Sequence, residues 1–421
     1  MNKNVMKKAA CLVIAAALIA APAASYADSA ASMESLSIGS WIRSVVQYIQ
    51  QILQGEEAVT IEYADSETVV MSDENNEVTI KEAGTYTVTG TCSDGSIKVK
   101  KGTEGVVLIL KDLDLTSKTG AALSLNKGTE TKIVIEGTVT LTDAEDTADE
   151  ELDTYDGAAI KAKAGSSTVL TGTGTLVING NAEHGIKVSG TDADDIADGY
   201  GDASFVIDGS LTVVITAAED GINSGTDLTI RNGNVTVSAG DDGIKADYIL
   251  NIGEEGTDGP VIDVKKSGEG LEGAVVNITS GTVDVTASDD GINAANSDLT
   301  DYAFSINITG GTVNVSAGAD GLDSNGDINI TGGLTTIVKA ASNGGEGGLD
   351  YQGTANIADG CLVNPYGVTM DSGMGGFGGP GGQMNGTPGQ MPDGTTGATP
   401  LMPPQNGHGP MGQPPQDGQR P

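Results

Sequence analysis

Acidic residues recur directly before a glycine along the middle of the chain, and their oxygens can act as metal ligands. The acid before the glycine is Asp220, Asp242, Glu269, Asp290 or Asp320, and a second acid precedes three of them: Glu219, Asp241 and Asp289. A single Asp-Gly pair is ordinary turn chemistry, because Asp hydrogen-bonds to nearby backbone. The doubled acids exceed what a turn needs, so at these three sites we favour metal binding over a turn role.

The second residue after the same glycines, or after their degenerate copies, changes its chemistry along the chain. In order it is Lys161, Lys187, Asn223, Lys245, Glu272, Asn293, Asp323 and Asp350. The position is therefore basic in its N-terminal copies and acidic in its C-terminal ones. We add Asp323 to the candidate metal ligands. We take Lys187 and Lys245 as candidate substrate contacts.

These acids can share ions only if the repeats stack in register. Like charges on neighbouring strands about 4.8 Å apart repel unless a cation neutralises them. The ligands are all oxygen, with no convergent histidine or thiolate. Such a set favours Ca²⁺ over zinc or copper.

Internal repeats supply the elements that must position these acids. The segments DLTIRNGNVTVSA (227–239), VVNITSGTVDVTA (275–287) and SINITGGTVNVSA (305–317) align residue for residue. With the strand that follows each DGI step, each copy holds three short strands and three turns, which is one coil of a parallel β-helix. A β-sandwich array fits poorly, because the strands are too short. We therefore predict an all-β solenoid with three strands per coil and no helix after residue 55.

The alternation within each coil separates an apolar inside from a polar outside. The residues predicted to point inward are Ile222, Leu228, Ile230, Val235 and Val237. An outward polar ladder is formed by Thr229, Asn277, Asn307 and Asn329, which we take as candidate contacts to sugar hydroxyls. We expect glycines at the corners to supply positive φ angles.

The flanking segments differ from the repeats. Residues 1–27 are typical of a secretory signal peptide, with three lysines before an apolar stretch, and an uncleaved anchor is the alternative. Residues 28–56 contain an amphipathic helix over 40–54 that can cap the solenoid, which occupies 57–370. Residues 371–421 are rich in Gly, Pro, Met and Gln and are predicted to be disordered. We expect a secreted protein, extracellular or associated with the cell surface.

Composition excludes several partners. The formal charge of −37 makes nucleic acid a poor partner and gives no attraction to anionic lipid, so we expect no membrane insertion. Aromatic residues are only 3%, which argues against an aromatic platform for sugars. Two cysteines, Cys92 and Cys361, remain after the signal peptide, and the stacking of repeats between them argues against a disulfide.

An ordered series of motifs resembles a known family. EAGTYTVTG (82–90), SDGSIKV (93–99), GAAIKAK (157–163) and GTLVINGNAEHGIK (174–187) precede the DGI repeats. Together they look like a secreted bacterial carbohydrate-binding family, first described from cellulolytic clostridia, whose members resemble polysaccharide lyases. The resemblance implies a right-handed parallel β-helix with surface Ca²⁺ sites and binding of plant-type polysaccharides, including cellulose and acidic polygalacturonate. His184, where an acid is usual, and the insertion at 142–155 depart from the family pattern.

Three functions follow from these observations. The first is a calcium-dependent, non-catalytic protein that binds acidic pectin or polygalacturonate, cellulose, or both. The second is a pectate-type lyase acting by calcium-assisted β-elimination, for which Lys187 or Lys245 would be the base. The third is a structural or adhesive protein of the cell surface whose calcium is only architectural.

Overall fold

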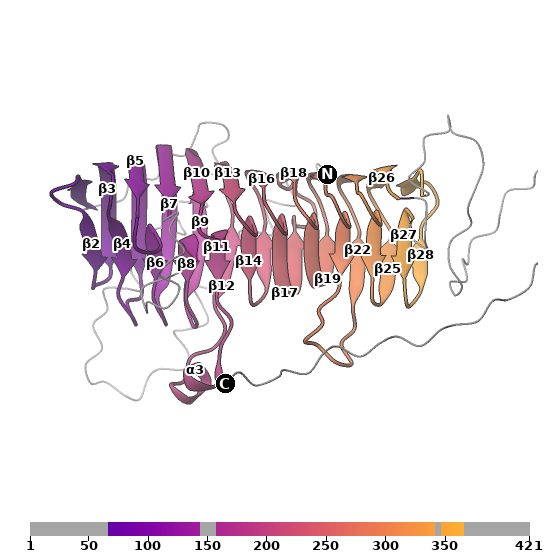
Figure 1. Ribbon diagram of the computed structural model, residues 1–421, viewed down its shortest axis with the longest axis horizontal. Helices are drawn as coiled ribbons and strands as arrows, with labels where there is room; N and C mark the ends of the chain where they lie inside the picture. Colours follow the sequence, from indigo (N-terminus) through magenta and orange to yellow (C-terminus); the bar gives the residue numbers. More distant parts are fainter. Residues whose placement is uncertain (1–65, 144–156, 342–346, 366–421) are drawn as a thin grey trace, which may run out of the picture. The chain divides into compact units, whose positions relative to one another are not determined.

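The computed structural model describes residues 66–143, 157–341 and 347–365 (Figure 1). The predicted signal peptide, the capping helix and the C-terminal tail all lie outside these residues. The described chain divides into two compact units. Unit 1 comprises the described residues up to Glu219 together with Ser224–Thr226. Unit 2 comprises Asp220–Asn223 and the described residues from Asp227 onward.

Unit 1 consists of short strands and one helical turn. Its strands are β1 (Ser66–Met71), β2 (Glu77–Ile80), β3 (Gly84–Cys92), β4 (Ser96–Val99), β5 (Val106–Thr116), β6 (Leu123–Leu125), β7 (Glu130–Thr142), β8 (Ala158–Ala162), β9 (Ser167–Gly172), β10 (Thr175–Gly180), β11 (His184–Val188), β12 (Ser204–Ile207) and β13 (Thr212–Ala217). The helix is α3 (Ala193–Ala197). β14 (Ile222–Ser224) has residues in both units.

Unit 2 continues the pattern without a described helix. Its strands are β15 (Leu228–Ile230), β16 (Asn234–Ser238), β17 (Ile244–Ile252), β18 (Val261–Lys266), β19 (Leu271–Ile278), β20 (Thr282–Thr286), β21 (Ile292–Ala294), β22 (Ser305–Ile308), β23 (Thr312–Ser316), β24 (Leu322–Ser324), β25 (Asp327–Ile330), β26 (Leu334–Lys339), β27 (Leu349–Tyr351), β28 (Ala355–Ile357) and β29 (Leu362–Val363).

Within each unit, all pairings between the named strands are parallel. In unit 2, β20, β23, β26 and β29 form one ladder, and β19, β22, β25 and β28 form a second. A third ladder joins β21, β24 and β27. From β20 onward each strand therefore pairs with the third strand after it, which is consistent with a parallel β-helix of three strands per coil.

The core of each unit is built from the apolar half of this alternation. β20, β23 and β25 each alternate buried and partly exposed residues along their length. The five residues predicted to point inward are all buried, none with more than 1% exposure: Ile222, Leu228, Ile230, Val235 and Val237. The inward stripe expected from the repeats is confirmed.

The polar ladder forms a continuous file of amides in unit 2. Asn251, Asn277, Asn307 and Asn329 lie opposite one another in successive coils. The Nδ2 atoms of Asn277, Asn307 and Asn329 each donate to the Oδ1 of the Asn in the preceding coil at 2.9 Å. Thr229 pairs with Asn251 at one end of the file. The side chains are half-buried, so the amides first satisfy one another and stabilise the stack.

The recurring glycines are required for space and not for backbone conformation. A Cβ on Gly291 would lie 2.1 Å from Val315 Cγ1 and 2.6 Å from the carbonyl oxygen of Gly321. Gly221, Gly243 and Gly270 would meet their neighbouring coils in the same way. None of these residues has a positive φ. Close approach of successive coils therefore explains the DGI glycines. The corner glycines Gly233, Gly281, Gly311 and Gly333 do have positive φ, as the sequence predicted.

The segment 191–202 contains a short helix, α3, where the sequence predicted none. Asp192 Oδ1 accepts the N–H of Asp195 at 2.7 Å and caps the helix. A helix of five residues is too short to show a period in the sequence.

Cys92 and Cys361 are both free thiols, as the sequence predicted. Among the described residues, no helix has the length and apolar character needed to cross a membrane.

We predict that Gly291→Ala lowers the free energy of unfolding by about 1–3 kcal/mol, because the added methyl overpacks the contact between coils. Urea unfolding at fixed calcium concentration measures the change. Gly201→Ala is the control, since a Cβ there meets nothing within 4 Å. Equal stability of the two variants would contradict the close-approach explanation.

Candidate metal centre

The acids that precede the recurring glycines stack in register in unit 2. We call Asp220, Asp242, Glu269, Asp290 and Asp320 the acid file. Backbone hydrogen bonds of 2.9–3.0 Å connect its coils: Gly221 N–H to Asp242, Gly243 N–H to Glu269, Gly270 N–H to Asp290 and Gly291 N–H to Asp320. The registry that the repeats predicted is therefore present in this unit.

A second file runs beside the first. We call Lys245, Glu272, Asn293, Asp323 and Asp350 the mixed file. These residues lie opposite one another in consecutive coils. Asn293 Nδ2 donates to Glu269 Oε2 at 2.9 Å, so side chains of the mixed file neutralise or hydrogen-bond those of the acid file.

Part of the acid file has a backbone role. Asp220 Oδ1 accepts the N–H of Asp242 at 2.9 Å, and Asp290 Oδ1 accepts the N–H of Asp320 at 2.8 Å. Asp320 Oδ1 accepts the N–H of Gly347. Each of these carboxylates therefore ties its coil to the next, which is an extension of the turn role that a lone Asp-Gly can fill.

Asp220, Asp241 and Asp242 form the first group of acids. One carboxylate oxygen from each lies within 4.8 Å of the others. Asp220 and Asp242 are buried, whereas Asp241 is exposed. Burial, followed by the charges of Asp242 and Asp220, raises the pKa of Asp241 above its usual value. Three carboxylates at this spacing strongly favour an added cation.

A second group shares Asp242 and contains a lysine. Asp242, Glu269 and Glu272 also bring one oxygen each within 4.8 Å of one another. Lys245 Nζ lies 2.9 Å from Asp242 Oδ2 and 2.7 Å from Glu272 Oε2. Burial, together with a hydrogen bond to Asp242, raises the pKa of Glu272, and Lys245 opposes this rise. One ammonium offsets only one of the three carboxylates when all are ionised.

The remaining predicted ligands lie farther apart. Among the described residues, Asp289, Asp290, Asp320 and Asp323 do not enter a group of three acids within 4.8 Å. Asp289 is flanked in its own file by Gly268 and Ala319, to which its backbone is hydrogen-bonded, so no acid stands opposite it. Burial and then the charges of Asp290, Asp320 and Asp350 raise the pKa of Asp323 to about 7.

Glu219 joins a different cluster. It belongs to unit 1 and lies near Glu183 and His184, not in a group with the acid file.

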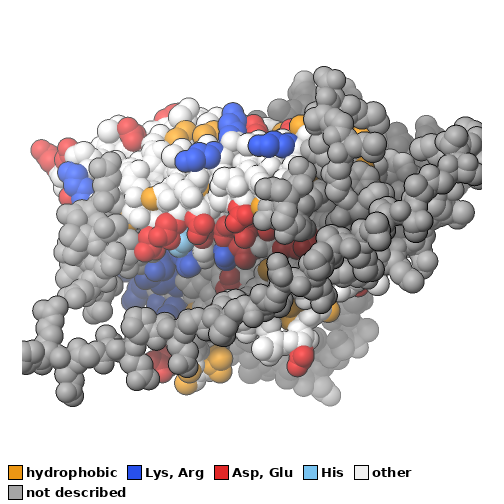
Figure 2. Space-filling view, turned by 45° about the vertical axis from the view of Figure 1, so that its right-hand side comes forward, with side chains coloured by type: hydrophobic (Ala, Val, Ile, Leu, Met, Phe, Trp, Pro, Cys, Tyr) orange, Lys and Arg blue, Asp and Glu red, His pale blue; other side chains and the backbone are white. Residues whose placement is uncertain are grey.

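Figure 2 shows Asp and Glu side chains gathered on the face that it draws, with lysines close to them. A ligand that binds this face must neutralise or tolerate its concentrated negative charge.

The two candidate lysines differ in environment. Burial alone would lower the pKa of Lys245, but its ion pairs with Glu272 and Asp242 outweigh burial and hold the pKa above its usual value. A protonated, paired ammonium is a poor general base. In unit 1, equivalent positions of successive coils pair with one another and form a file. In chain order its members are Lys98, Ser124, Lys161 and Lys187. Unit 1 therefore carries a mostly basic file.

The candidate sugar contacts keep part of their hydrogen-bonding capacity. An amide has two N–H donors and two oxygen lone pairs. Asn277 uses one of each for its neighbours in the file, whereas Asn307 Nδ2 donates both to Asn277 Oδ1 and to Ser305 Oγ at 2.9 Å. Sequence reasoning missed Asn251, because its copy has one extra residue between Ala246 and Ile249, where the ladder register shifts.

Sequence reasoning also missed an aromatic group in unit 2. The rings of Tyr248 and Tyr302 have centroids 6.3 Å apart, and those of Tyr302 and Phe304 lie 5.7 Å apart. Asn296 Nδ2 donates to the carbonyl of Asp247 at 2.8 Å and fixes the loop that carries two of the rings. The low aromatic content of the chain gave no signal for this gathering.

The residues present fit a calcium ion at the first group. Ca²⁺ takes six to eight oxygens at about 2.4 Å, and three carboxylates supply only part of that number. The exposure of Asp241 leaves the solvent side of the group open. Zinc prefers nitrogen and sulfur ligands, which this group lacks.

We predict that Asp323→Asn stabilises the calcium-free protein at pH 8 but not at pH 4. The folded-state pKa of this carboxyl is raised, so its ionisation opposes folding: stability is highest below its unfolded pKa of about 4 and falls as pH rises through about 7. The change in pKa corresponds to about 4 kcal/mol. Because the side chain is only half-buried, solvent screening reduces the expected gain to about 1–2 kcal/mol.

Urea unfolding in EGTA at the two pH values measures this difference. Asp258→Asn, which removes an exposed acid in the same unit, is the control for net charge. A gain of equal size at both pH values, or in both variants, would contradict the assignment.

Comparison with known proteins identifies the family of this chain. The model of a family described as carbohydrate-binding domain-containing protein matches residues 74–248 and 256–361. A solved structure described as the polysaccharide lyase-like protein from C. thermocellum, in a gadolinium derivative, is 24% identical, with 70% of this chain and 98% of that chain covered and a TM-score of 0.38. No curated protein matches. The matched residues span most of the chain, and the protein belongs to the carbohydrate-binding domain family.

Proposed function

We propose that this protein binds acidic polysaccharides through calcium, without cleaving them. The observation that carries this conclusion is the position of Asp242, which is buried and shared by two groups of three acids. Five carboxylates converge there, and Lys245 pairs with two of them, Asp242 and Glu272. A divalent cation resolves this excess of negative charge, and membership in a carbohydrate-binding family gives the ligand class.

Calcium would be held by Asp220, Asp241 and Asp242. When bound, it would supply a positive charge to which a sugar carboxylate can bind. Asp220 and Asp242 are fixed by the hydrogen bond between the Asp220 carboxylate and the Asp242 N–H, so they form a rigid base. The exposed Asp241 carboxylate faces the solvent side, where a uronic acid can approach.

The preference for an acidic polysaccharide follows from charge. A protein with a formal charge of −37 repels an anionic glycan over most of its surface. Calcium at the acid file reverses the sign locally in unit 2. The amide file of the same unit can add hydrogen bonds to sugar hydroxyls through its remaining donors and lone pairs. Polygalacturonate can use both of these features.

The remaining features of the proposal concern fold and location. We propose that the parallel strands wind as a right-handed β-helix, in keeping with the connection rule for parallel strands. We also propose that the chain is secreted, because residues 1–27 have the pattern of a signal peptide.

The two alternatives are less well supported. A lyase needs a base at the sugar α-proton, and the ion pairs of Lys245 keep its ammonium protonated. A purely architectural calcium would require no exposed ligand, whereas Asp241 is exposed. Binding without cleavage is therefore the function that the site supports best.

We expect insoluble polygalacturonate to retain the protein in calcium and to release it in EGTA. Asp241→Asn should weaken retention by about tenfold or more, because it removes a ligand charge at the open side of the site. Asp258→Asn makes the same charge change on exposed surface of unit 2 and should retain binding. Retention that survives complete chelation would rule out a calcium bridge.

The same incubations distinguish the alternatives. Appearance of unsaturated sugar products, followed by ultraviolet absorbance, would establish a lyase. Loss of calcium binding in Asp241→Asn with unchanged retention on polygalacturonate would show that calcium is architectural.

Lys187→Gln should weaken binding to polygalacturonate about two- to fivefold, since a partly exposed ion pair contributes about 0.2–1 kcal/mol. Binding to a neutral glucan such as cellulose should not change. Lys100→Gln, at an exposed position in the same unit, is the matched control. Equal losses for charged and neutral polysaccharides would exclude a charge-specific role for Lys187.

A further inference from the structure

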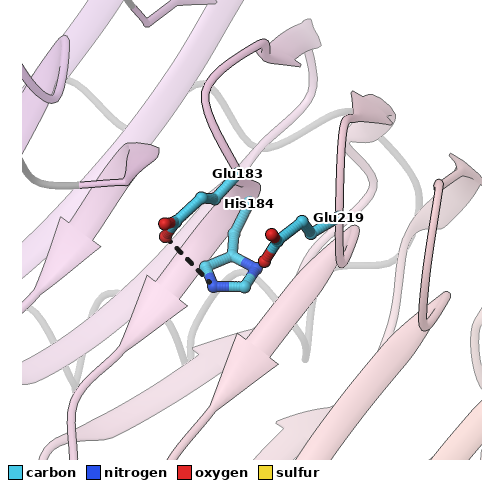
Figure 3. A group of neighbouring side chains, drawn as sticks. All are labelled: Glu183, His184 and Glu219. Carbon is cyan, nitrogen blue, oxygen red and sulfur yellow. Dashed lines mark ion pairs between the residues drawn. The ribbon is translucent and has the colours of Figure 1, made fainter. Parts of the chain in front are cut away.

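Unit 1 contains a cluster of possible metal ligands that differs chemically from the acid file. Glu183 lies just before β11, His184 is its first residue, and Glu219 follows β13. One ligand atom from each of the three side chains lies within 4.8 Å of the others. Figure 3 shows both glutamate side chains directed toward the imidazole ring.

Backbone contacts hold these side chains in place. The N–H of Glu219 donates to the carbonyl of Glu183 at 2.8 Å, so the two glutamates stand opposite each other in adjacent coils. The N–H of His184 donates to the carbonyl of Gly157 at 2.9 Å. Ala158 lies opposite His184 on that side, and its small side chain adds no ligand. The ligands therefore come from one coil and the coil that follows it.

The separation of the side chains suits a shared ion. His184 Nε2 lies 3.7 Å from Glu183 Oε2, which is beyond a hydrogen bond. Two ligands, each about 2.1 Å from a tetrahedral ion, lie about 3.4 Å apart. His184 is only 6% exposed, while Glu183 is half-buried and Glu219 is exposed. The imidazole is thus fixed in the protein, and the cluster opens to solvent at Glu219.

The nitrogen ligand changes which metal the cluster prefers. His184 occupies the position before a recurring glycine, where the acid file of unit 2 has carboxylates. Oxygen ligands suit Ca²⁺, whereas imidazole with carboxylates suits Zn²⁺ and its neighbours in the first transition series. Two carboxylates and a neutral imidazole also balance the charge of a divalent ion. Among the described residues this is the only histidine.

We propose that Glu183, His184 and Glu219 bind a divalent transition metal of the zinc class, at a site separate from calcium. The site does not depend on the calcium-bridged function proposed above. The competing explanation is an imidazolium held by two carboxylates without any metal. The two explanations differ in whether Zn²⁺ binds, and in whether the imidazole is one of its ligands.

Isothermal titration of the full chain with ZnCl₂, in excess Ca²⁺ to fill the oxygen sites, tests this assignment. We expect one zinc ion per chain that depends on this cluster. His184→Ala and Glu219→Gln should each weaken its binding by about tenfold or more, since even outer-shell partners of a metal contribute tenfold or more. Asp241→Asn should leave zinc binding unchanged, and His408→Ala controls for the second histidine of the chain.

A second measurement does not rely on a folded His184 variant. Co²⁺ added to the wild-type protein should give a visible absorption band that Zn²⁺ displaces and Ca²⁺ does not, and Glu219→Gln, at an exposed position, should weaken it. Zinc binding that is unchanged in His184→Ala and Glu219→Gln would overturn the assignment. So would displacement of Co²⁺ by equimolar Ca²⁺, or an imidazole NMR signal that zinc does not perturb.

Discussion

Each coil must lie against the next with equivalent residues directly opposite, and the rest of the structure depends on this constraint. Parallel pairing places equivalent side chains about 4.8 Å apart, so any residue type that repeats becomes a continuous file. The glycines at the DGI steps allow the coils to meet, because a Cβ at Gly291 would lie 2.1 Å from Val315 Cγ1. Apolar files then form the core, and Asn files form amide ladders.

An acid file is a product of this registry that is unfavourable by itself, because like charges lie opposite one another. The chain reduces the repulsion in several ways: Asp220 and Asp290 accept backbone N–H groups of the following coil, and Asn293 donates to Glu269. Lys245 pairs with two acids at once. In the group of Asp242, Glu269 and Glu272, one lysine faces three carboxylates, and this excess of acidic groups makes the site suited to a cation.

The same registry would suit the polysaccharide ligand that we propose. A polymer of repeating sugars matches a surface on which charged and amide groups repeat from coil to coil, so each weak contact can be made several times. The chain's membership in a carbohydrate-binding family is consistent with this match. Replacing one acid by histidine, as at His184, changes the ligand chemistry of one coil without disturbing the stack.

The sequence by itself determined the parallel coils, the inward stripe and the files that contain Asp242, Glu272 and Asn277, because a repeat in register converts spacing along the chain into position in space. Only the tertiary structure decided which file members converge. Asp289–Asp290 has the same doubled acids as Asp241–Asp242, yet among the described residues only the latter pair enters a group of three acids within 4.8 Å. Which carboxylates come together depends on the residues in adjacent coils and on the direction of each side chain. A local sequence motif determines neither.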